Sequence, residues 1–253
     1  MTASDTARVT VAGVSKTFEG EEGPVRALQD VEFEVRDGEF VCIVGPSGCG
    51  KTTLFRIIGG IDRATGGDVL LSGEPVTGPT PDLGIVFQEY HLFPWRTVRE
   101  NVAFGLEQTG TEAERRRERV DEMLRLVGLE GSGDSYPSRL SGGMKQRVAI
   151  ARALAVDPEL LLMDEPFGSV DAQTRNMLHE ELLDIWAETG KTVLFVTHDV
   201  EEAVKLADRI IVMSSGPGSV SEIVDVDLDR PRDRTDVAFG EYQERALSLI
   251  RDS

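Results

Sequence analysis

The chain has 253 residues, enough for one large α/β domain or for an α/β domain with a helical insertion, and too few for several large domains. Acidic residues number 45 against 27 basic ones, giving a formal net charge of -18, so nucleic acid is not expected as a partner. The sequence has no run of about 18 apolar residues and no secretory signal at its start, which predicts a chain that stays in the cytosol.

Short apolar runs alternate with helical periodicity along the chain, a pattern typical of a largely parallel sheet covered by helices. Short apolar runs predict strands at residues 31–35, 40–44, 160–163, 192–196 and 209–213. More even alternation predicts half-exposed antiparallel strands at residues 8–18, 68–71 and 219–226. Helical periodicity predicts helices at residues 51–59, 98–106, 112–127, 142–155, 171–188 and 200–207. The charged tail after Asp227 is expected to lie on the surface.

The predicted helices of residues 96–136 follow one another without a strand between them. This succession predicts a helical subdomain inserted into the α/β core at about residues 96–156. We expect the whole chain, residues 1–253, to form a single domain around that insertion.

The strand at residues 40–44 runs into a glycine-rich loop of the pattern G-x-x-x-x-G-K-[ST], followed by a predicted helix. Glycines let successive N–H groups point inward, and the helix start adds partial positive charge. A glycine-rich turn that only caps the helix is the alternative. The pattern favours phosphate binding, with Lys51 on the outer phosphates and Thr52 on Mg²⁺. The predicted binding residues are Gly45, Ser47, Gly48, Cys49, Gly50, Lys51, Thr52 and Thr53.

An acidic pair, Asp164 and Glu165, ends the apolar run at residues 160–163. Alone, such a pair is more often a solvated strand end, but beside a phosphate loop it indicates hydrolysis. Asp164 is expected to hold Mg²⁺, and Glu165 to face the γ-phosphate as a base or a water-positioning group. His198 ends another predicted strand, where α/β folds place ligand contacts.

Residues 140–147 read Leu-Ser-Gly-Gly-Met-Lys-Gln-Arg and place a second anion site at a helix start. One chain already has a phosphate loop, so a second anion site implies a second subunit. The segment resembles the signature motif of ABC ATPases, and the order of the elements is similar to that family across nearly the whole chain. The resemblance implies a head-to-tail dimer that binds ATP and Mg²⁺. The signature residues expected to act in trans are Ser141, Gly142, Gly143 and Gln146.

Other positions match that family individually. Gln88 resembles the Q-loop glutamine, which contacts Mg²⁺ and the attacking water. Asp171 resembles the D-loop aspartate that crosses the dimer interface, although Ser169 and Val170 replace the more usual Ala-Leu. His198 resembles the switch histidine that holds the γ-phosphate. Phe18 is similar to the aromatic residue that stacks on adenine; a core phenylalanine at a strand end is the alternative.

The stretch after Gln88 identifies a subgroup by resemblance. Residues 92–95 read Leu-Phe-Pro-Trp and residues 101–106 read Asn-Val-Ala-Phe-Gly-Leu, similar to the ATPases of nitrate, sulfonate and taurine importers. Pro217-Gly218 and the tail through Arg230-Pro231-Arg232 also resemble that group. The resemblance implies a separate integral-membrane permease, an extracytoplasmic solute-binding protein, and no separate C-terminal regulatory domain. The solute itself cannot be deduced from this subunit.

By resemblance the fold is α/β: a P-loop NTPase of the ABC ATPase type, with a mainly parallel core sheet, an antiparallel β subdomain and the inserted helical subdomain. The implied function is ATP hydrolysis that powers uptake of a small solute, at the cytoplasmic face of the membrane as a peripheral subunit. A soluble ABC ATPase that moves no solute is the main alternative, and a nucleotide-binding regulatory protein without turnover is another. The intact Glu165 and His198 disfavour the regulatory protein.

Overall fold

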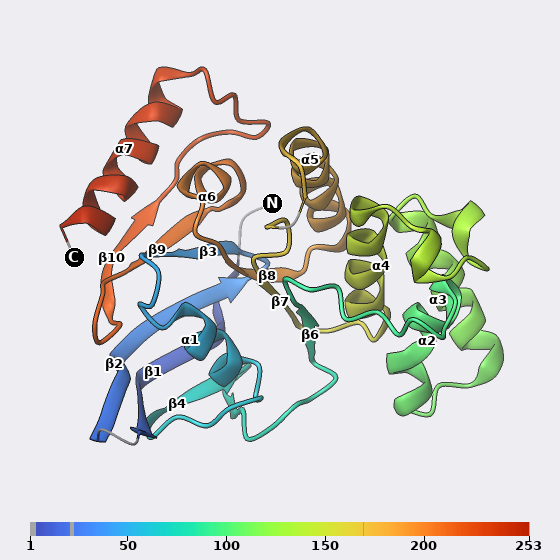
Figure 1. The fold of residues 1–253 in the computed structure, drawn as a ribbon, viewed down its shortest axis with the longest axis horizontal. Coiled ribbons are helices and arrows are strands. Elements are labelled where there is room, and N and C mark those ends of the chain that lie inside the picture. Colours follow the sequence, from blue (N-terminus) through green and yellow to red (C-terminus); the bar gives the residue numbers. More distant parts are fainter. Residues whose placement is uncertain (1–3, 21–22, 169, 253) are drawn as a thin grey trace. The chain divides into compact units, whose positions relative to one another are not determined.

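The computed structural model describes residues 4–20, 23–168 and 170–252, which form two compact units. The first unit contains the described residues up to Pro79 together with those from Thr192 onward, and the second runs from Thr80 to Lys191. Figure 1 labels the elements of both units. Whether the whole chain acts as a single domain with a helical insertion at about residues 96–156 stays a prediction.

An antiparallel sheet in the first unit has the strand order β2-β1-β4-β5. Its strands are β1 (Ser4–Gly20), β2 (Gly23–Asp37), β4 (Gly66–Leu71) and β5 (Glu74–Pro75). Alternate residues of β2 are buried, among them Val31, Phe33 and Val35, because successive side chains of a strand point to opposite faces. The half-exposed strands expected from alternation at residues 8–18 and 68–71 are therefore confirmed.

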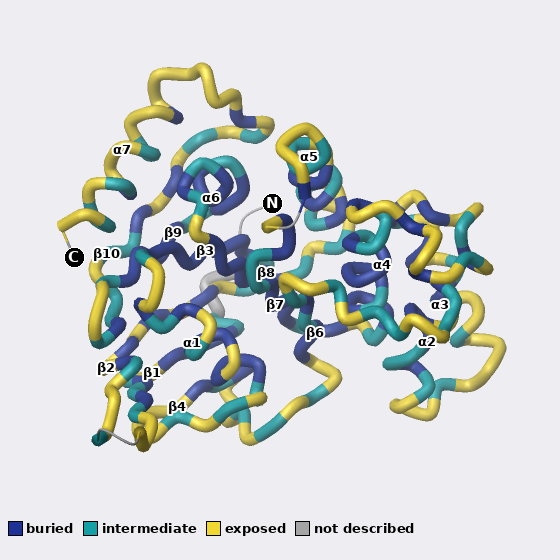
Figure 2. The backbone as a smooth tube through the Cα atoms, viewed as in Figure 1, coloured by how far each residue is buried: buried dark blue, intermediate teal, exposed yellow. Residues whose placement is uncertain are grey.

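A second set of strands in the first unit is mainly parallel. Strand β3 (Phe40–Val44) pairs in parallel with β8 (Thr192–Val196) and β9 (Arg209–Met213), and β10 (Val220–Asp225) pairs antiparallel with β9. Every residue of β3 and β8 is buried, as their continuous apolar runs require (Figure 2). Since β3 and β8 are parallel neighbours, the loops that follow them leave the same edge of the sheet.

Helices cover these strands within the first unit. Helix α1 (Lys51–Ile58) packs on β2 and β8, whereas α6 (Val200–Leu206) packs on β3. Helix α7 (Val237–Arg251) packs on α6, β9 and β10, and the three elements lie beside it in Figure 1. Most residues of the tail after Asp227 are exposed, as expected, but the tail also forms α7, whose residues Phe239 and Ala246 are buried.

The second unit combines a parallel strand pair with most of the helices. Strands β6 (Leu83–Val86) and β7 (Leu160–Asp164) pair in parallel. Helices α2 (Val98–Gln108), α3 (Ala113–Leu126) and α4 (Gly142–Ala155) contact one another, and α4 also contacts α5 (Ala172–Thr189). Two short 3₁₀ turns, η1 (Glu130–Ser132) and η2 (Pro137–Arg139), precede α4.

Side-chain caps explain where several helices begin. The Thr97 hydroxyl accepts from the Glu100 N–H at 3.2 Å, and the Glu100 carboxylate accepts from the Thr97 N–H at 2.8 Å, a capping box that starts α2. Ser141 and Asp171 cap α4 and α5 with a single bond each, in which the side-chain oxygen accepts from the N–H of Met144 and of Thr174, respectively. Within the described ranges, no helix combines the length and the apolar character needed to cross a lipid bilayer.

Phe239 should anchor α7, because its side chain is 1 % exposed. We expect Phe239→Ala to lower the free energy of unfolding by about 3 kcal/mol through lost burial and a residual cavity, measured by urea denaturation. Val237→Ala on the same helix is the matched control, since Val237 is 80 % exposed and its truncation should change little. Equal effects of the two substitutions would contradict the observed packing of α7.

Candidate functional site

The glycine-rich loop leads from β3 into α1 within the first unit. Gly48 and Gly50 have φ angles of 81° and 92°, in the left-handed region that glycine adopts without strain. A Cβ on Gly45 would lie 2.8 Å from the Met213 carbonyl oxygen, and one on Gly50 would lie 2.5 Å from the Leu28 side chain. Side chains at these positions would therefore clash as well as strain the loop.

The start of α1 fits an anion. Gly50 is its N-cap, no side chain caps it among the described residues, and its first turn contains no acidic residue. The first N–H groups of a helix have no intrahelical partner and carry the positive end of the helix dipole. Helices α2, α4, α5 and α6, in contrast, have side-chain caps. A phosphate group would supply the acceptors that the sequence around Gly50 does not.

Lys51 lies across this loop with its side chain largely buried. Its Nζ donates to the Gly45 carbonyl at 2.8 Å and to the Pro46 carbonyl at 3.1 Å, and it is 3.8 Å from Cys49 Sγ. Both Cys42 and Cys49 are buried free thiols, as expected for reduced cysteines, and burial raises the pKa of the Cys42 thiol well above its ordinary value. The ammonium group of Lys51 is thus held at the loop by neutral acceptors.

Phe18 is an exposed aromatic residue on β1 rather than a core residue, because 42 % of its surface is accessible. The Nζ of Lys16 lies 4.9 Å from the centre of the Phe18 ring, a cation–π contact. That Nζ also donates to Asp62 Oδ1 at 2.8 Å, a bond that lowers the pKa of the Asp62 carboxyl. The ring of Phe18 therefore has an accessible face beside a fixed cation, suited to stacking.

His198 follows β8 and is exposed, directly before Asp199, which caps α6. The Asp199 carboxylate accepts from the Glu201 N–H at 2.9 Å and from the Glu202 N–H at 3.4 Å. Since β3 and β8 are parallel neighbours, His198 and the glycine-rich loop lie at the same sheet edge in the first unit.

In the second unit, β7 ends at Asp164, which is half-buried, and Glu165 follows with a φ of 42°. A non-glycine residue in the left-handed region is uncommon and costs conformational energy, and such residues cluster at functional sites. A turn closes directly afterward, where the Gly168 N–H donates to the Glu165 carbonyl at 3.0 Å.

The structure brings Gln88 and Glu165 together around that turn. A Cβ on Gly168 would lie 3.2 Å from Gln88 Nε2 and 3.8 Å from Glu165 Oε2, so the two side chains flank the same glycine. Glycine therefore leaves room for both groups. Sequence reasoning related Gln88 and Glu165 only through their expected roles at the attacking water, and no sequence pattern marked Gly168 as the residue between them.

The signature segment begins α4. Ser141 is its N-cap, with its hydroxyl accepting from the Met144 N–H at 3.3 Å, and Ser141 and Gly142 are exposed. Gly143 is buried, and a Cβ there would meet the Thr174 side chain of α5 at 3.1 Å. Gln146 is 0 % exposed, and neither polar atom of its amide has a hydrogen-bond partner among the described residues.

Asp171 caps α5 through a 3.0 Å bond from the Thr174 N–H, which lowers the pKa of the Asp171 carboxyl. Arg175 donates to the Val170 carbonyl at 3.0 Å and so holds the preceding turn. Ser169, one of the two departures from the usual D-loop, lies outside the described residues, whereas Val170 is buried.

Arg152 is a residue that sequence reasoning missed. From α4 it donates to the Tyr90 carbonyl at 3.0 Å and to the His91 carbonyl at 2.7 Å, and burial lowers the pKa of its guanidinium. The Tyr90 hydroxyl lies 3.1 Å from where a Cβ on Gly142 would be. The segment after Gln88 is thus bonded to the signature helix through Arg152, and its Tyr90 side chain lies close to the start of that helix.

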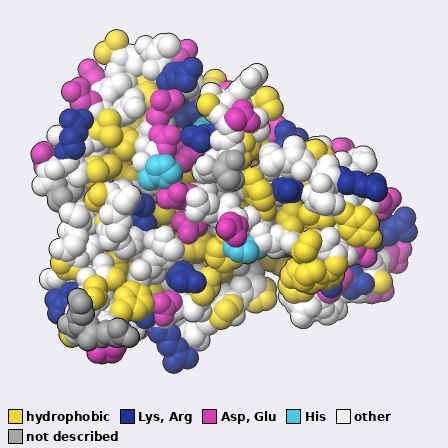
Figure 3. Space-filling model, in the orientation of Figure 1, with side chains coloured by type: hydrophobic (Ala, Val, Ile, Leu, Met, Phe, Trp, Pro, Cys, Tyr) yellow, Lys and Arg dark blue, Asp and Glu magenta, His cyan; other side chains and the backbone are white. Residues whose placement is uncertain are grey.

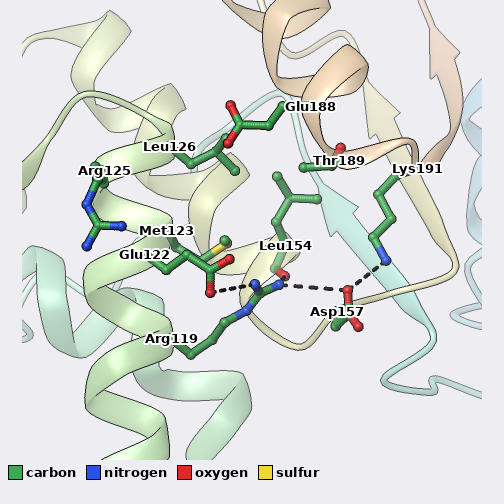
Figure 4. Close-up of a pocket in the computed structure, with 10 residues that line it drawn as sticks. All are labelled: Arg119, Glu122, Met123, Arg125, Leu126, Leu154, Asp157, Glu188, Thr189 and Lys191. Carbon is green, nitrogen blue, oxygen red and sulfur yellow. Dashed lines mark hydrogen bonds and ion pairs between the residues drawn. The ribbon is translucent and has the colours of Figure 1, made fainter.

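A cavity of about 410 Å³ in the second unit has a different character (Figure 4). Arg119 pairs with Glu122 at 2.9 Å, and Lys191 pairs with Asp157 at 2.7 Å. Arg119 also donates to the Leu154 carbonyl at 2.9 Å near the end of α4. These opposite charges neutralise one another, and no predicted site residue lines the cavity. We therefore interpret the side chains that line it as a structural ion-pair network.

No cluster of three or more His, Cys, Asp or Glu side chains suited to a metal occurs in the part of the chain that the structure describes. A Mg²⁺ site built from one carboxylate, a hydroxyl, an amide and substrate phosphates needs no such cluster, because Mg²⁺ is commonly held by one or two carboxylates plus phosphate oxygens. The donor set of Asp164, Thr52 and Gln88 has this composition.

Comparisons with known proteins identify the family of the chain. The chain is 54% identical over 245 residues to an uncharacterized ABC transporter ATP-binding protein of Methanocaldococcus jannaschii, covering 97% of this chain and 92% of that one. It is 46% identical over 250 residues to the nitrate import ATP-binding protein NrtD of Synechocystis sp. (95% and 94%). It is 44% identical over 239 residues to the aliphatic sulfonates import ATP-binding protein SsuB of Bacillus cereus (94% of each).

A solved dimeric structure of a post-hydrolysis state of the ATP-binding cassette MJ0796 bound to ADP and Pi superimposes with a TM-score of 0.75 at 36% identity, covering 87% of this chain and all of that one. The predicted P-loop fold is therefore confirmed. A family profile described as "ABC transporter" matches residues 28–168. The chain belongs to the ABC transporter ATP-binding family, whose members are ATPases.

Proposed function

We propose that the chain is the ATP-hydrolysing subunit of an importer for a small solute of the nitrate, sulfonate or taurine type, acting on a separate permease. The observation that supports this proposal most directly is an exposed cluster of aromatic side chains in the segment from the end of β6 into α2. Trp95 is 71 % exposed, and its ring lies 5.6 Å from that of Phe93, which in turn lies 4.6 Å from Phe104. In Figure 3, hydrophobic side chains gather on the surface where this segment runs.

The cluster is held as a unit and not as a loose loop. The Arg96 guanidinium lies over Phe93 and Phe104, at 5.6 and 5.2 Å from the ring centres, and bonds Glu107 at 2.7 Å. Asn101 is buried and donates to the carbonyls of Phe93, Arg96 and Thr97. A rigid, exposed tryptophan on a polar surface is typical of a protein-docking anchor.

For the chemistry, we assign ATP phosphates to the loop from Gly45 to Thr53 and adenine to Phe18. Thr52, Gln88 and Asp164 would hold Mg²⁺, which would neutralise the charge on the outer phosphates. Glu165 would accept a proton from the attacking water, and His198 would contact the γ-phosphate. The left-handed backbone at Glu165 and its pairing with Gln88 around Gly168 support these roles.

A second copy of the chain completes each site in this proposal. The exposed Ser141 and Gly142 at the start of α4, with Gly143 and Gln146 behind them, would cover the γ-phosphate held by the partner, and Asp171 would cross the interface. ATP that binds the closed dimer more tightly than the open one would supply the work, since a ligand shifts an equilibrium only by its differential affinity. The subunit would sit peripherally at the cytoplasmic face of the membrane through the permease.

Lys51→Ala should weaken ATP binding by roughly 100-fold, about 3 kcal/mol, because it removes the buried cation from the phosphate loop. Isothermal titration with MgATP measures the change. Arg56→Ala is the matched control, because it removes a positive charge from an exposed position of the same helix. Unchanged affinity in the Lys51 variant would refute the phosphate-loop assignment.

Glu165→Gln should bind ATP, form a stable dimer, and lose turnover by about 100-fold or more, since an amide cannot accept the proton. Phosphate release reports turnover, and gel filtration with MgATP reports the dimer. Glu130→Gln, an exposed carboxylate of η1, should leave both unchanged. Normal turnover without Glu165 would remove this residue from the mechanism.

Trp95→Ala should abolish recovery of a polytopic permease, because a tryptophan anchor that becomes buried on docking is worth about 2 kcal/mol or more. The same substitution in the chain with Glu165 intact should keep its ATPase activity. The parent chain and the Trp95→Ala variant are captured in the Glu165→Gln background from detergent-solubilised native membranes with MgATP, and partners are identified by mass spectrometry. Tyr136→Ala removes a different exposed aromatic ring of the second unit as a control.

Recovery of only soluble partners by an intact ATP-bound dimer would overturn the importer assignment in favour of a soluble ATPase. If a permease is recovered, the solute-binding protein that accompanies it is screened with nitrate, sulfonates and pyrimidines.

A further inference from the structure

The tail segment Arg230-Pro231-Arg232, here called the tail clamp, is bonded to the end of α6. Arg232 is only 8 % exposed, and its Nη1 donates to the carbonyls of Val204 and Ala207, each at 2.6 Å. Its Nη2 donates to the Val226 carbonyl at 3.1 Å and its Nε to the Leu228 carbonyl at 3.0 Å. One planar fork thus joins α6 to the segment that follows β10.

Arg230 extends the tail clamp to the strand that leads into the phosphate loop. Its Nη2 donates to the Leu206 carbonyl at 2.6 Å, and its Nη1 bonds Asp208 Oδ1 at 2.7 Å. The other oxygen of Asp208 accepts from the Phe40 N–H at 2.9 Å, and the Asp208 N–H donates to the Phe40 carbonyl at 2.7 Å. Arg230, Asp208 and the first residue of β3 are therefore linked by direct hydrogen bonds.

The opposite end of α6 carries His198. The helix has 7 residues and is about 10 Å long at 1.5 Å per residue, so its two ends cannot move independently. At its start the buried Glu202 accepts from the Thr197 hydroxyl, which in turn accepts from the Asp199 N–H at 3.0 Å. The backbone on both sides of His198 is thereby fixed to α6.

Burying the guanidinium of Arg232 in this space costs free energy. Burial, together with the charge of Arg230, lowers the pKa of Arg232 to about 10. Desolvating a guanidinium costs free energy that an apolar side chain of similar volume would not incur. What the guanidinium adds is a fixed set of donors for helix-terminal carbonyls, which otherwise lack partners, and a positive charge at the negative end of the helix.

We propose that the tail clamp is a positioning element for ATP hydrolysis: by fixing the end of α6 against β3, it sets the position of His198 relative to the phosphate loop. Arg230 and Arg232 touch no nucleotide in this assignment and act through His198. The inference rests on the proposed role of His198.

A double-mutant cycle with His198 tests the tail clamp. Because small misplacement of a catalytic group can cost up to about 100-fold, we expect Arg232→Ala to lower kcat by about tenfold. The KM for MgATP should stay within about twofold, since the phosphate loop is intact. In the His198→Ala background, the same substitution should lower kcat by less than about twofold, because the group it positions is gone. Arg232→Lys, which keeps the charge but not the fork, should fall between.

Control variants distinguish an effect on the position of His198 from an effect on folding. Arg245→Ala breaks a 2.5 Å ion pair with Glu222 on α7 and β10 without touching α6, and should leave kcat unchanged. Methylguanidinium should restore part of the lost kcat of Arg232→Ala. If that variant does not fold, Arg232→Lys takes its place in the cycle.

Additive losses in the cycle, or a KM that rises in step with the fall in kcat, would overturn the inference. A melting temperature that falls while kcat per bound nucleotide is unchanged would also overturn it. If His198→Ala alone turns over normally, the proposed role of His198 fails first and removes the basis of the tail clamp. If His198→Ala lowers kcat and the losses in the cycle are additive, the role of His198 stands and only the positioning role of the tail clamp is overturned.

Discussion

Helix α1 begins with N–H groups that its own sequence does not satisfy, and much of the first unit follows from this constraint. Gly50 contributes a left-handed turn and no side-chain acceptor. The loop can close only because Gly45 and Gly50 lack a Cβ, for which the surrounding carbonyls and side chains leave no room. Buried strands β3 and β8 then present this helix start and His198 at one sheet edge. An anion is the natural complement of such an arrangement.

The second unit contributes carboxylate and amide side chains, whereas the first unit contributes the N–H donors at the start of α1. Carboxylates and an amide, rather than cations, gather at the end of β7 and around Gly168, and the backbone at Glu165 is held in a conformation that an isolated residue avoids. Arg152 on α4 donates to the carbonyls of Tyr90 and His91 and so connects the segment after Gln88 to the signature helix. The segment that carries Trp95 and the helix that begins at Gly142 are therefore joined by direct hydrogen bonds within the second unit.

Sequence reasoning predicted the family, the fold and the ATPase class of this protein, whereas it did not predict the contacts that support the candidate site. Apolar runs in the sequence predicted the bounds of β3, β8 and β9 to the residue. The candidate site residues were predicted from motifs whose chemical roles are understood. Helix α7 was missed because Phe239 and Ala246 are spaced among charges and Gly240 interrupts the helical pattern. Arg152 and Arg232 were missed for a different reason. Both bind backbone carbonyls, and since every residue has a carbonyl, no sequence pattern marks the acceptor.

The buried amide of Gln146 affects how readily α4 can move. Its amide is enclosed in α4 with no hydrogen-bond partner among the described residues, and a buried polar group left in this state costs about 1–3 kcal/mol. An arrangement that gave the amide partners would be lower in energy by a similar amount. The buried amide thus stores free energy that a shift of α4 toward a donor and an acceptor would release.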